Sequence, residues 1–399
     1  MIKKRDGRQV PFNIEKIANA IFKAAQTVGG KDYSEAMELA DKVCQQLSEE
    51  VIGRDPSVEE VQDMVERVLV EQGHAKTAKA YILYRADRTR AREMNSTLMK
   101  IYEDLTFMSA SDCDIKRENA NIDGDTAMGT MLKYGSEGAK QFNEMYVLDP
   151  KHSQAHINGD IHIHDLDFLT LTTTCCQIDL LKLFHGGFST GHGYLREPND
   201  ISSYAALACI AIQSNQNDQH GGQSVPIFDY AMAEGVKKTF RRLYTTNLAK
   251  AVSFTLGIED YTEVLEEFKL IAGDIAKEYG LYPSLQNNDE YKAKEWEIAS
   301  AKYGDEFSHL QDRAEKLAES ETDRATYQAM EALIHNLNTM NSRAGAQNPF
   351  SSINYGTDTS PEGRMVIKNV MLAEEHGLGN GETPIFPIHI FKVKEGVNY

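Results

Sequence analysis

With 399 residues, the chain is too long for one ordinary hydrophobic core, and its length predicts two or three domains. Its 42 Lys and Arg residues against 60 Asp and Glu residues leave a net charge of −18. An acidic surface disfavours wrapping a nucleic-acid backbone, which needs a basic face, although a few local cations can still hold one triphosphate.

The first residues and the cysteines indicate the compartment. Residues 1–12 carry charge with no apolar run behind it, so we expect no signal peptide, and no stretch approaches the ~20 apolar residues of a membrane span. Five cysteines in a chain of this length do not suit a disulfide framework, and no pair has the C-x-x-C spacing of a zinc ribbon. We therefore expect a cytoplasmic protein with no membrane partner, no nucleic-acid partner and no metal site in this chain.

The first 95 residues have the pattern of a small α+β domain. Asp6-Gly7 is a two-residue turn signal between short apolar stretches, so residues 1–12 are predicted to form a β-hairpin. Asn13 can cap a helix whose apolar positions recur at helical spacing, and Ser57 to Glu60 reads as a capping box. Helices are predicted to start after Asn13, after Ser34 (covering 35–51), after Ser57, and near Lys76, the last running to Arg92. This unit is assigned to residues 1–95.

Residues 96–399 are different in kind and form the second predicted domain. Strands separated by long helices fit an α/β architecture. In chain order the pattern predicts helices over 95–145, an alternating strand over 159–165, a β-branched run passing into an apolar one over 170–184, a loop over 185–195, a helix over 202–213, a polar loop over 215–227, charged helices over 258–342, and loop and strand over 344–356.

A candidate phosphate site lies at the start of the chain. The turn Lys4-Arg5-Asp6-Gly7 and Lys16 bring three cations next to a predicted helix N-terminus, whose free N–H groups and partial positive charge suit phosphate. Arg85 and Arg88 lie one helical turn apart and could complete the site. On spacing alone, a solvated charged hairpin with ordinary helix caps explains these residues equally well.

Residues 2–24, Val58 to Val68 and the Tyr81-to-Arg88 helix together resemble the ATP-cone domain. ATP cones bind ATP or dATP and switch ribonucleotide reductases on or off. The resemblance implies nucleotide contacts by Lys4, Arg5, Gly7, Asn13 and Lys16, with Gln62 at a position where the family often has a polar residue facing the base. A transcriptional repressor of reductase genes also carries this domain, but behind a zinc ribbon for which this chain has no C-x-x-C pair.

Two further motifs suggest chemistry in the second domain. His162 and His164 would share one face of a strand, which is how some metal sites begin, but no third ligand is evident; hydrogen bonding to Asp165 or Asp167 is the alternative. Adjacent Cys175 and Cys176 would point to opposite faces of a strand, so only one can face a site. Two small buried hydrophobic side chains are the alternative for that pair.

The stretch from Gly159 to Asp167, followed by Cys175-x-x-Ile178-Asp179-Leu180, resembles the anaerobic, class III ribonucleoside-triphosphate reductases. So do His220-Gly221-Gly222-Gln223-Ser224 and the stretch from Asn348 to Gly356. The resemblance implies a ten-stranded α/β barrel of the glycyl-radical type, with Cys175 as the second cysteine facing the substrate. Candidate substrate or effector contacts are His162, His164, His220, Gly221, Gly222, Gln223, Ser224, Asn348 and Asn354.

In that family a radical-SAM activase installs a glycyl radical, which passes to a cysteine inside the barrel; the thiyl abstracts the ribose 3′ hydrogen and the 2′ hydroxyl leaves as water. Formate or a dithiol supplies the electrons. We expect this chain to be the N-terminal portion, inactive alone, with the glycyl radical and a zinc site beyond Tyr399, and to work as a homo-oligomer. Cys209, expected on a helix, suits the thiyl role poorly. A non-catalytic nucleotide sensor with a degenerate barrel, or another glycyl-radical enzyme, are the alternatives.

Overall fold

The computed structural model describes residues 1–4, 8–109, 111–117, 122–170, 173–304 and 306–399. These residues form two compact units, the first made of residues 1–104 and 144–153 and the second of residues 105–143 and 154–399. Each unit has its own hydrophobic core. Among the described residues, no helix is long and apolar enough to cross a membrane.

The first unit contains the predicted hairpin and the predicted helices. Antiparallel strands pair Ile2 with Val10 and Lys3 with Gln9, while the turn residues 5–7 lie outside the described residues. The elements are β1 (Ile2–Lys3), β2 (Gln9–Val10), α1 (Ile14–Thr27), α2 (Tyr33–Glu50), α3 (Val58–Glu71) and α4 (Ala75–Phe107). Apolar positions at helical spacing, such as Ile17 and Ile21 of α1, are buried against α2 and α3.

Helix capping in the first unit follows the sequence closely. The Asn13 side chain accepts a hydrogen bond from the Lys16 N–H, and Ser57 with Glu60 forms the predicted capping box. Helix α2 starts slightly earlier than predicted because Asp32, two residues before Ser34, supplies its cap. Helix α4 continues to Phe107, past the predicted end near Arg92, since no Gly or Pro interrupts it.

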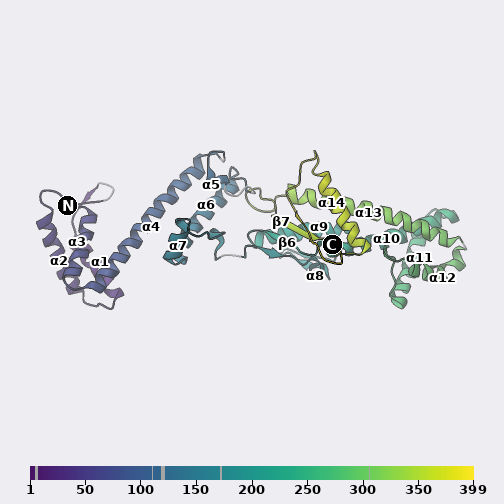
Figure 1. Ribbon diagram of the computed structural model, residues 1–399, viewed down its shortest axis with the longest axis horizontal. Coiled ribbons are helices and arrows are strands. Elements are labelled where there is room, and N and C mark those ends of the chain that lie inside the picture. Colours follow the sequence, from purple (N-terminus) through teal and green to yellow (C-terminus); the bar gives the residue numbers. More distant parts are fainter. Residues whose placement is uncertain (5–7, 110, 118–121, 171–172, 305) are drawn as a thin grey trace. The chain divides into compact units, whose positions relative to one another are not determined.

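The second unit is mostly helical around one parallel sheet (Figure 1). Its four strands are β3 (Cys176–Gln177), β6 (Gln223–Val225), β7 (Ser351–Tyr355) and β8 (Ile388–Phe391), in that order. A separate hairpin consists of β4 (Phe188–Ser189) and β5 (Tyr194–Leu195). The remaining elements after α4 are α5 (Asp114–Arg117), α6 (Ala127–Phe142), a π-helix (Asn143–Val147), α7 (Pro150–Ile157), a 3-10 turn (Leu166–Phe168), α8 (Leu180–Phe184), α9 (Ile201–Asp218), α10 (Phe228–Leu256), α11 (Tyr261–Tyr279), α12 (Asp289–Tyr303), α13 (Phe307–Thr339) and α14 (Pro361–His376).

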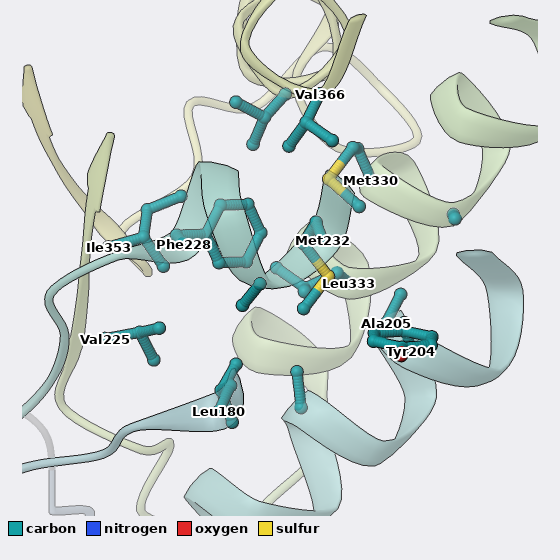
Figure 2. Packing of buried hydrophobic residues seen from close by; sticks show 14 of the residues in the cluster. Leu180, Tyr204, Ala205, Val225, Phe228, Met232, Met330, Leu333, Ile353 and Val366 are labelled. Atoms are coloured by element: carbon teal, nitrogen blue, oxygen red, sulfur yellow. The ribbon is translucent and has the colours of Figure 1, made fainter. Parts of the chain in front are cut away.

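One face of the sheet is covered by helices, and this is where the core lies. Val225 of β6 and Ile353 of β7 point toward Phe228 at the start of α10 and toward Leu333 of α13, as Figure 2 shows. Because side chains alternate along a strand, the residues next to Val225 on β6 and next to Ile353 on β7 have their side chains on the opposite face of the sheet. Parallel strands joined by long helices match the predicted α/β class, and the predicted strand within 344–356 is confirmed as β7.

Several predicted elements of the second unit are wrong in type or extent. Residues 159–165 form turns and bends, so the alternating pattern there does not make a strand. Within 170–184, outside residues 171–172, only Cys176–Gln177 is strand, and the apolar end is helix α8. The predicted loop at 185–195 contains the β4–β5 hairpin, and the predicted loop at 215–227 holds the end of α9 and the central strand β6. Short strands carry too few residues for periodicity to identify them.

The charged segment 258–342 is helical as predicted, and it forms a second core with the end of α10. Phe268 of α11 and Phe307 of α13 stack with ring centroids 5.9 Å apart. The Glu295 carboxylate is buried in this core and accepts hydrogen bonds from Tyr244 (2.7 Å), Tyr291 (3.1 Å) and Gln311 (2.8 Å). These bonds compensate for taking the carboxylate out of water.

Candidate functional site

The candidate phosphate site in the first unit lies where the hairpin meets two helix N-termini. Helix α1 starts just after β2 with the Asn13 cap, and the N–H of Lys3 donates to the carbonyl of Pro56 (2.9 Å), immediately before the Ser57 cap of α3. Lys4 and Lys16 are exposed. A helix N-terminus attracts anions, but the N-terminus of α3 already carries Glu59 and the capping carboxylate of Glu60. Arg5 and Gly7, also predicted contacts, lie outside the described residues.

The other predicted nucleotide contacts lie on α3 and α4. Arg85 is ion-paired with Asp63 (2.5 Å) and Glu66 (2.8 Å) of α3. Burial alone lowers the pKa of Arg85, but its hydrogen bonds to these two carboxylates more than offset that effect and raise it. Arg88 is exposed and lies over the ring of Tyr84, and Gln62 is half-buried on α3. Arg85 therefore stabilises the packing of α4 on α3 in this structure.

The open face of the parallel sheet is the candidate site of the second unit. It carries Ser224, Ser352 and Asn354 on the central strands, and the Ser224 hydroxyl donates to the Asn354 side chain (3.0 Å). Ile388 and Ile390 of β8 extend the same face and are exposed. A cavity of about 450 Å³ opens here, and its lining includes both adjacent cysteines, Cys175 and Cys176, together with Gln177, Gln223, Ser224, Ser352, Ile388 and Ile390. A mixed polar and apolar cavity of this size can hold a small molecule.

The two adjacent cysteines have different surroundings. Cys175, just before β3, is exposed, and it lies two residues before Gln177, which the register places beside Ser224 of the open face. Cys176 is paired with the buried Gln223 and accepts a hydrogen bond from Asn215 of α9 (2.9 Å). The thiol of Cys175 is thus available on the open face, while the thiol of Cys176 is held by a side chain from the helical side.

The structure brings two separate motifs together beside Cys175. His220 lies in the α9–β6 loop (residues 219–222), and its Nε2 is 3.2 Å from Oδ1 of Asp165. The His220 ring also stacks on Phe168, with centroids 3.9 Å apart. Asp165 adopts a left-handed backbone conformation, with φ of 49°. The GDIHIHDLD and HGGQS stretches therefore meet through one carboxylate–imidazole pair.

The remaining candidates from these motifs lie away from the open face or support it. His162 and His164 are exposed and contact one another, Nε2 to Nδ1 at 3.3 Å, and His164 Nε2 is 3.6 Å from Asp165. Within the described ranges, no group of three or more His, Cys, Asp or Glu side chains is arranged to hold a metal ion. Asn348 donates to the carbonyl of Asn338 (2.7 Å) and fixes the approach to β7.

Gln223 accepts from Asn215 (2.7 Å), and its Nε2 is buried with no hydrogen-bond partner among the described residues. Gly221 and Gly222 form the loop that adjoins Cys175. Of the predicted substrate contacts, Ser224 and Asn354 thus share the open face with Cys175, whereas Gln223 lines the cavity but its side chain is buried and bonded to Asn215 of α9. Cys209 lies on α9 as predicted, and burial raises the pKa of its thiol to about 12, which makes it unreactive.

Sequence reasoning missed a basic pocket on the helical side of the second unit. A cavity of about 570 Å³ is lined by Lys238, Arg241 and Arg242 of α10, by Lys269 of α11 and by the carboxylate of Glu197, which is ion-paired with Lys238. Burial alone lowers the pKa of Lys238, but its hydrogen bonds to Glu197 and Tyr204 raise it. Three of the four cations lie on α10, at positions one residue or about one turn apart. The fourth, Lys269, lies on α11. The run Lys237-Lys238-x-x-Arg241-Arg242 was the available signal.

Two family models match this chain. The model of the ATP cone domain matches residues 1–90, and the model of the anaerobic ribonucleoside-triphosphate reductases matches residues 118–399. The two matched segments follow one another along the chain, in the same order as the motifs that resemble these two families. The chain belongs to the anaerobic ribonucleoside-triphosphate reductase family.

Individual relatives agree with the family models. The anaerobic ribonucleoside-triphosphate reductases of Salmonella typhimurium and Escherichia coli are 26% and 27% identical to the chain, over all of it and over 47% of their own length. The chain therefore spans about half the length of these relatives. A crystal structure of the anaerobic ribonucleotide reductase from Thermotoga maritima, in complex with dATP and CTP, covers 71% of this chain and 40% of its own length at 13% identity, with a TM-score of 0.38. That similarity is too low to support an argument about the fold.

Proposed function

We propose that this chain forms the nucleotide-sensing domain and the first half of the catalytic barrel of a reductase that converts ribonucleoside triphosphates to deoxyribonucleoside triphosphates. The observation that carries the proposal is the exposed Cys175 thiol beside a cavity on the polar open face of a parallel sheet. The proposed reductase is regulated by ATP and dATP, is activated by a radical-SAM enzyme and works as a homo-oligomer. The sensing domain covers residues 1–95 and the barrel half residues 96–399.

The exposed sheet face supports a barrel. All-parallel sheets are normally covered on both faces, because the helices that connect their strands pack against them. Here helices cover one face, while Ile388 and Ile390 remain 44% and 42% exposed on the other. In the proposed ten-stranded barrel, the half of the reductase that the relatives carry beyond this chain closes over that face. The cavity beside Cys175 would then lie inside the barrel.

Cys175 has the surroundings that radical reduction of a ribose needs. The glycyl radical expected in the rest of the reductase supplies hydrogen-atom chemistry that starts from a cysteine on the opposite side of the substrate. In the proposed arrangement the Sγ–H of Cys175 would face the ribose and give it a hydrogen atom after the 2′ hydroxyl has left as water, and formate or a dithiol would reduce the thiyl left on Cys175. Ser224 and Asn354 would bind the polar groups of the ribose. The Ser224–Asn354 hydrogen bond fixes both side chains before the substrate arrives.

The test is the activity of two single variants of the complete reductase. Cys175→Ser should abolish nucleotide reduction, because an O–H bond is too strong to give up its hydrogen atom, while ATP binding by the sensing domain stays unchanged. Cys176→Ala is the matched control and should cost about 1 kcal/mol of stability but keep activity. The glycyl radical is verified in each variant by electron paramagnetic resonance. An active Cys175→Ser reductase beside an inactive Cys176→Ala would refute the assignment.

The sensing function rests on cations beside two helix N-termini. In this proposal Lys4, Arg5 and Lys16 hold the triphosphate of ATP or dATP, Gly7 and Asn13 adjoin it, Arg88 completes the site, and Gln62 contacts the base. Arg85 joins only if its pairs with Asp63 and Glu66 open. Charge-assisted contacts to phosphate contribute roughly 1.5–3 kcal/mol each.

Calorimetry tests the sensing function. Lys16→Ala should weaken ATP binding about tenfold or more. Lys23→Ala is the matched control, because it removes the same charge from an exposed position two turns further along α1 and should leave the affinity unchanged. Equal affinities of Lys16→Ala and the unaltered chain would contradict the proposed site.

We also infer that the basic pocket on α10 and α11 binds the phosphate groups of a second nucleotide. Four cations around one cavity favour this, since Arg and Lys side chains bind phosphate oxygens well. Deoxynucleoside triphosphates titrated into the Lys16→Ala chain, where the sensing site is weakened about tenfold, should show a second binding event beside the weakened one, and Arg242→Ala should remove that second event. A single, weakened binding event in Lys16→Ala would argue against a second site.

A further inference from the structure

The α9–β6 loop contacts the backbone on both sides of Cys175. The N–H of His220 donates to the carbonyl of Thr173 (3.0 Å), and the N–H of Cys176 donates to the carbonyl of Gly222 (3.2 Å). The exposed thiol is therefore carried by a segment whose backbone is tied to the loop just before it and just after it. These bonds continue the pairing of β3 with β6 past the end of the strand.

Gly221 brings the loop closer to Cys175 than any other residue type could. Its φ is +103°, in the left-handed region that side chains disfavour. A Cβ at this position would lie 1.9 Å from the carbonyl oxygen of Thr174 and 3.5 Å from Sγ of Cys175. Any side chain at position 221 would therefore displace the segment that carries the thiol.

The first two residues of the loop are themselves anchored. The His220 ring pairs with Asp165 at 3.2 Å and stacks on Phe168, and the side chains of the pair are only 14% and 16% exposed. At Gln219, the carbonyl accepts a hydrogen bond from Arg343 (3.1 Å). Arg343 is half-buried, and the same guanidinium nitrogen also donates to the carbonyl of Gln216 at the end of α9 (2.9 Å). The loop is thus fixed to segments far away in the sequence.

From these contacts we propose that the α9–β6 loop is a clamp that holds the Cys175 thiol at one place on the open face. Gly221 and the Asp165–His220 pair are its positioning residues. The proposal rests on the function proposed above, because it assigns the clamp to a thiol that must meet a substrate. A group that exchanges a hydrogen atom has to be held to within roughly 0.5 Å of its productive position. The clamp provides that placement although Cys175 is exposed.

A nitroxide spin label on Cys175 tests the clamp in the 399-residue chain. Cys44→Ser and Cys176→Ala remove the two half-exposed thiols, and Cys113 and Cys209 are buried, so the label attaches at Cys175. The electron paramagnetic resonance spectrum reports how freely the label moves. In this parent variant the clamp predicts an immobilised spectrum.

Four substitutions in the parent variant separate the clamp from general loosening. Gly221→Ala and Asp165→Ala should each make a mobile component the larger part of the spectrum. Asp165→Asn should restore the parent spectrum, since Asn tolerates a left-handed backbone and keeps an oxygen to accept from His220. Gly191→Ala is the matched control, because Gly191 has a φ of +91° but nothing lies within 4 Å of a Cβ there. It should leave the spectrum immobilised.

The proposal is overturned if the label is already mobile in the parent variant, or if Gly221→Ala and Asp165→Ala leave the spectrum unchanged. It is also overturned if Gly191→Ala makes the label as mobile as Gly221→Ala does. Circular dichroism checks that each variant folds, and His220→Ala replaces Gly221→Ala if the latter does not. The label's motion requires neither nucleotide nor radical. The spectra can therefore contradict the clamp while the proposed ATP binding and nucleotide reduction are upheld. If the activity test contradicts the proposed function, the spectra still test the clamp.

Discussion

The two units of the molecule are stabilised over different distances along the chain. In the first unit, the hairpin pairs Ile2 with Val10, and the helix caps join Asn13 to Lys16 and Ser57 to Glu60. In the second unit, neighbouring strands come from around residues 176, 223, 351 and 388. The comparison teaches that a local defect in the first unit should stay local. A defect at one long-range anchor of the second unit should affect the sheet as a whole.

The largest stability effect is expected at Asp229, the strongest such anchor. Its buried carboxylate on α10 accepts hydrogen bonds from the N–H groups of Gly356, Thr357 and Asp358, between 2.8 and 3.1 Å, just after β7. Asp229→Ala would leave these donors without their partner and should destabilise the second unit by about 3–5 kcal/mol. Urea unfolding followed by circular dichroism measures the change.

A local carboxylate is the control for Asp229. Asp260 caps α11 from an exposed position and accepts only from Thr262, two residues away. Asp260→Ala should cost far less than Asp229→Ala. Similar losses in the two variants would contradict the importance of long-range anchors.

A smaller, pH-dependent effect is expected at Glu295. Burial raises the pKa of its carboxyl, against the hydrogen bonds from Gln311, Tyr244 and Tyr291 that lower it. The folded chain therefore holds a proton that the unfolded chain has released, and stability should fall as the pH rises from the ordinary Glu pKa through the raised one. A tenfold difference in proton affinity between the folded and the unfolded chain corresponds to about 1.4 kcal/mol of stability.

Glu295→Gln should flatten this part of the stability curve, because an amide does not titrate. Unfolding midpoints measured at several pH values test the effect. Glu297→Gln removes an exposed carboxylate from the same helix and should keep the slope of the parent. An identical pH dependence in Glu295→Gln and the parent would show that the buried carboxyl does not titrate in this range.

The smallest effect is expected at the capping box of the first unit. Ser57→Ala removes the acceptor for the Glu60 N–H and should cost about 1 kcal/mol. Ser48→Ala, near the end of α2, removes a hydroxyl that bonds only to the preceding turn and should cost nothing measurable. The spectrum of a label on Cys175 should be the same in both variants; a change in Ser57→Ala would mean that the defect is not local.

The first unit and the helices could be predicted from sequence because their signals are short-range. Asn13, Ser57 and the Asp6-Gly7 turn identified the caps and the hairpin, and apolar spacing identified α1 and α3. The sheet was harder, since β3 and β6 have two and three residues and offer no periodicity. The alternation of Asp160 to His164 resembled a strand, but no partner strand pairs with it among the described residues.

The sequence by itself determined the hairpin and the capped starts of α1 and α3 in the first unit, the order of the two family motifs and the presence of two cysteines of which one can face a site. These features depend on neighbouring residues and on short motifs. Only the tertiary structure decided that Cys175 lies on the open face, that Asp165 pairs with His220, and that four cations surround the pocket on α10 and α11. Each of these three features brings together residues from segments that are distant in the sequence. Strand pairing and helix packing decide which segments become neighbours, and local sequence patterns do not encode that.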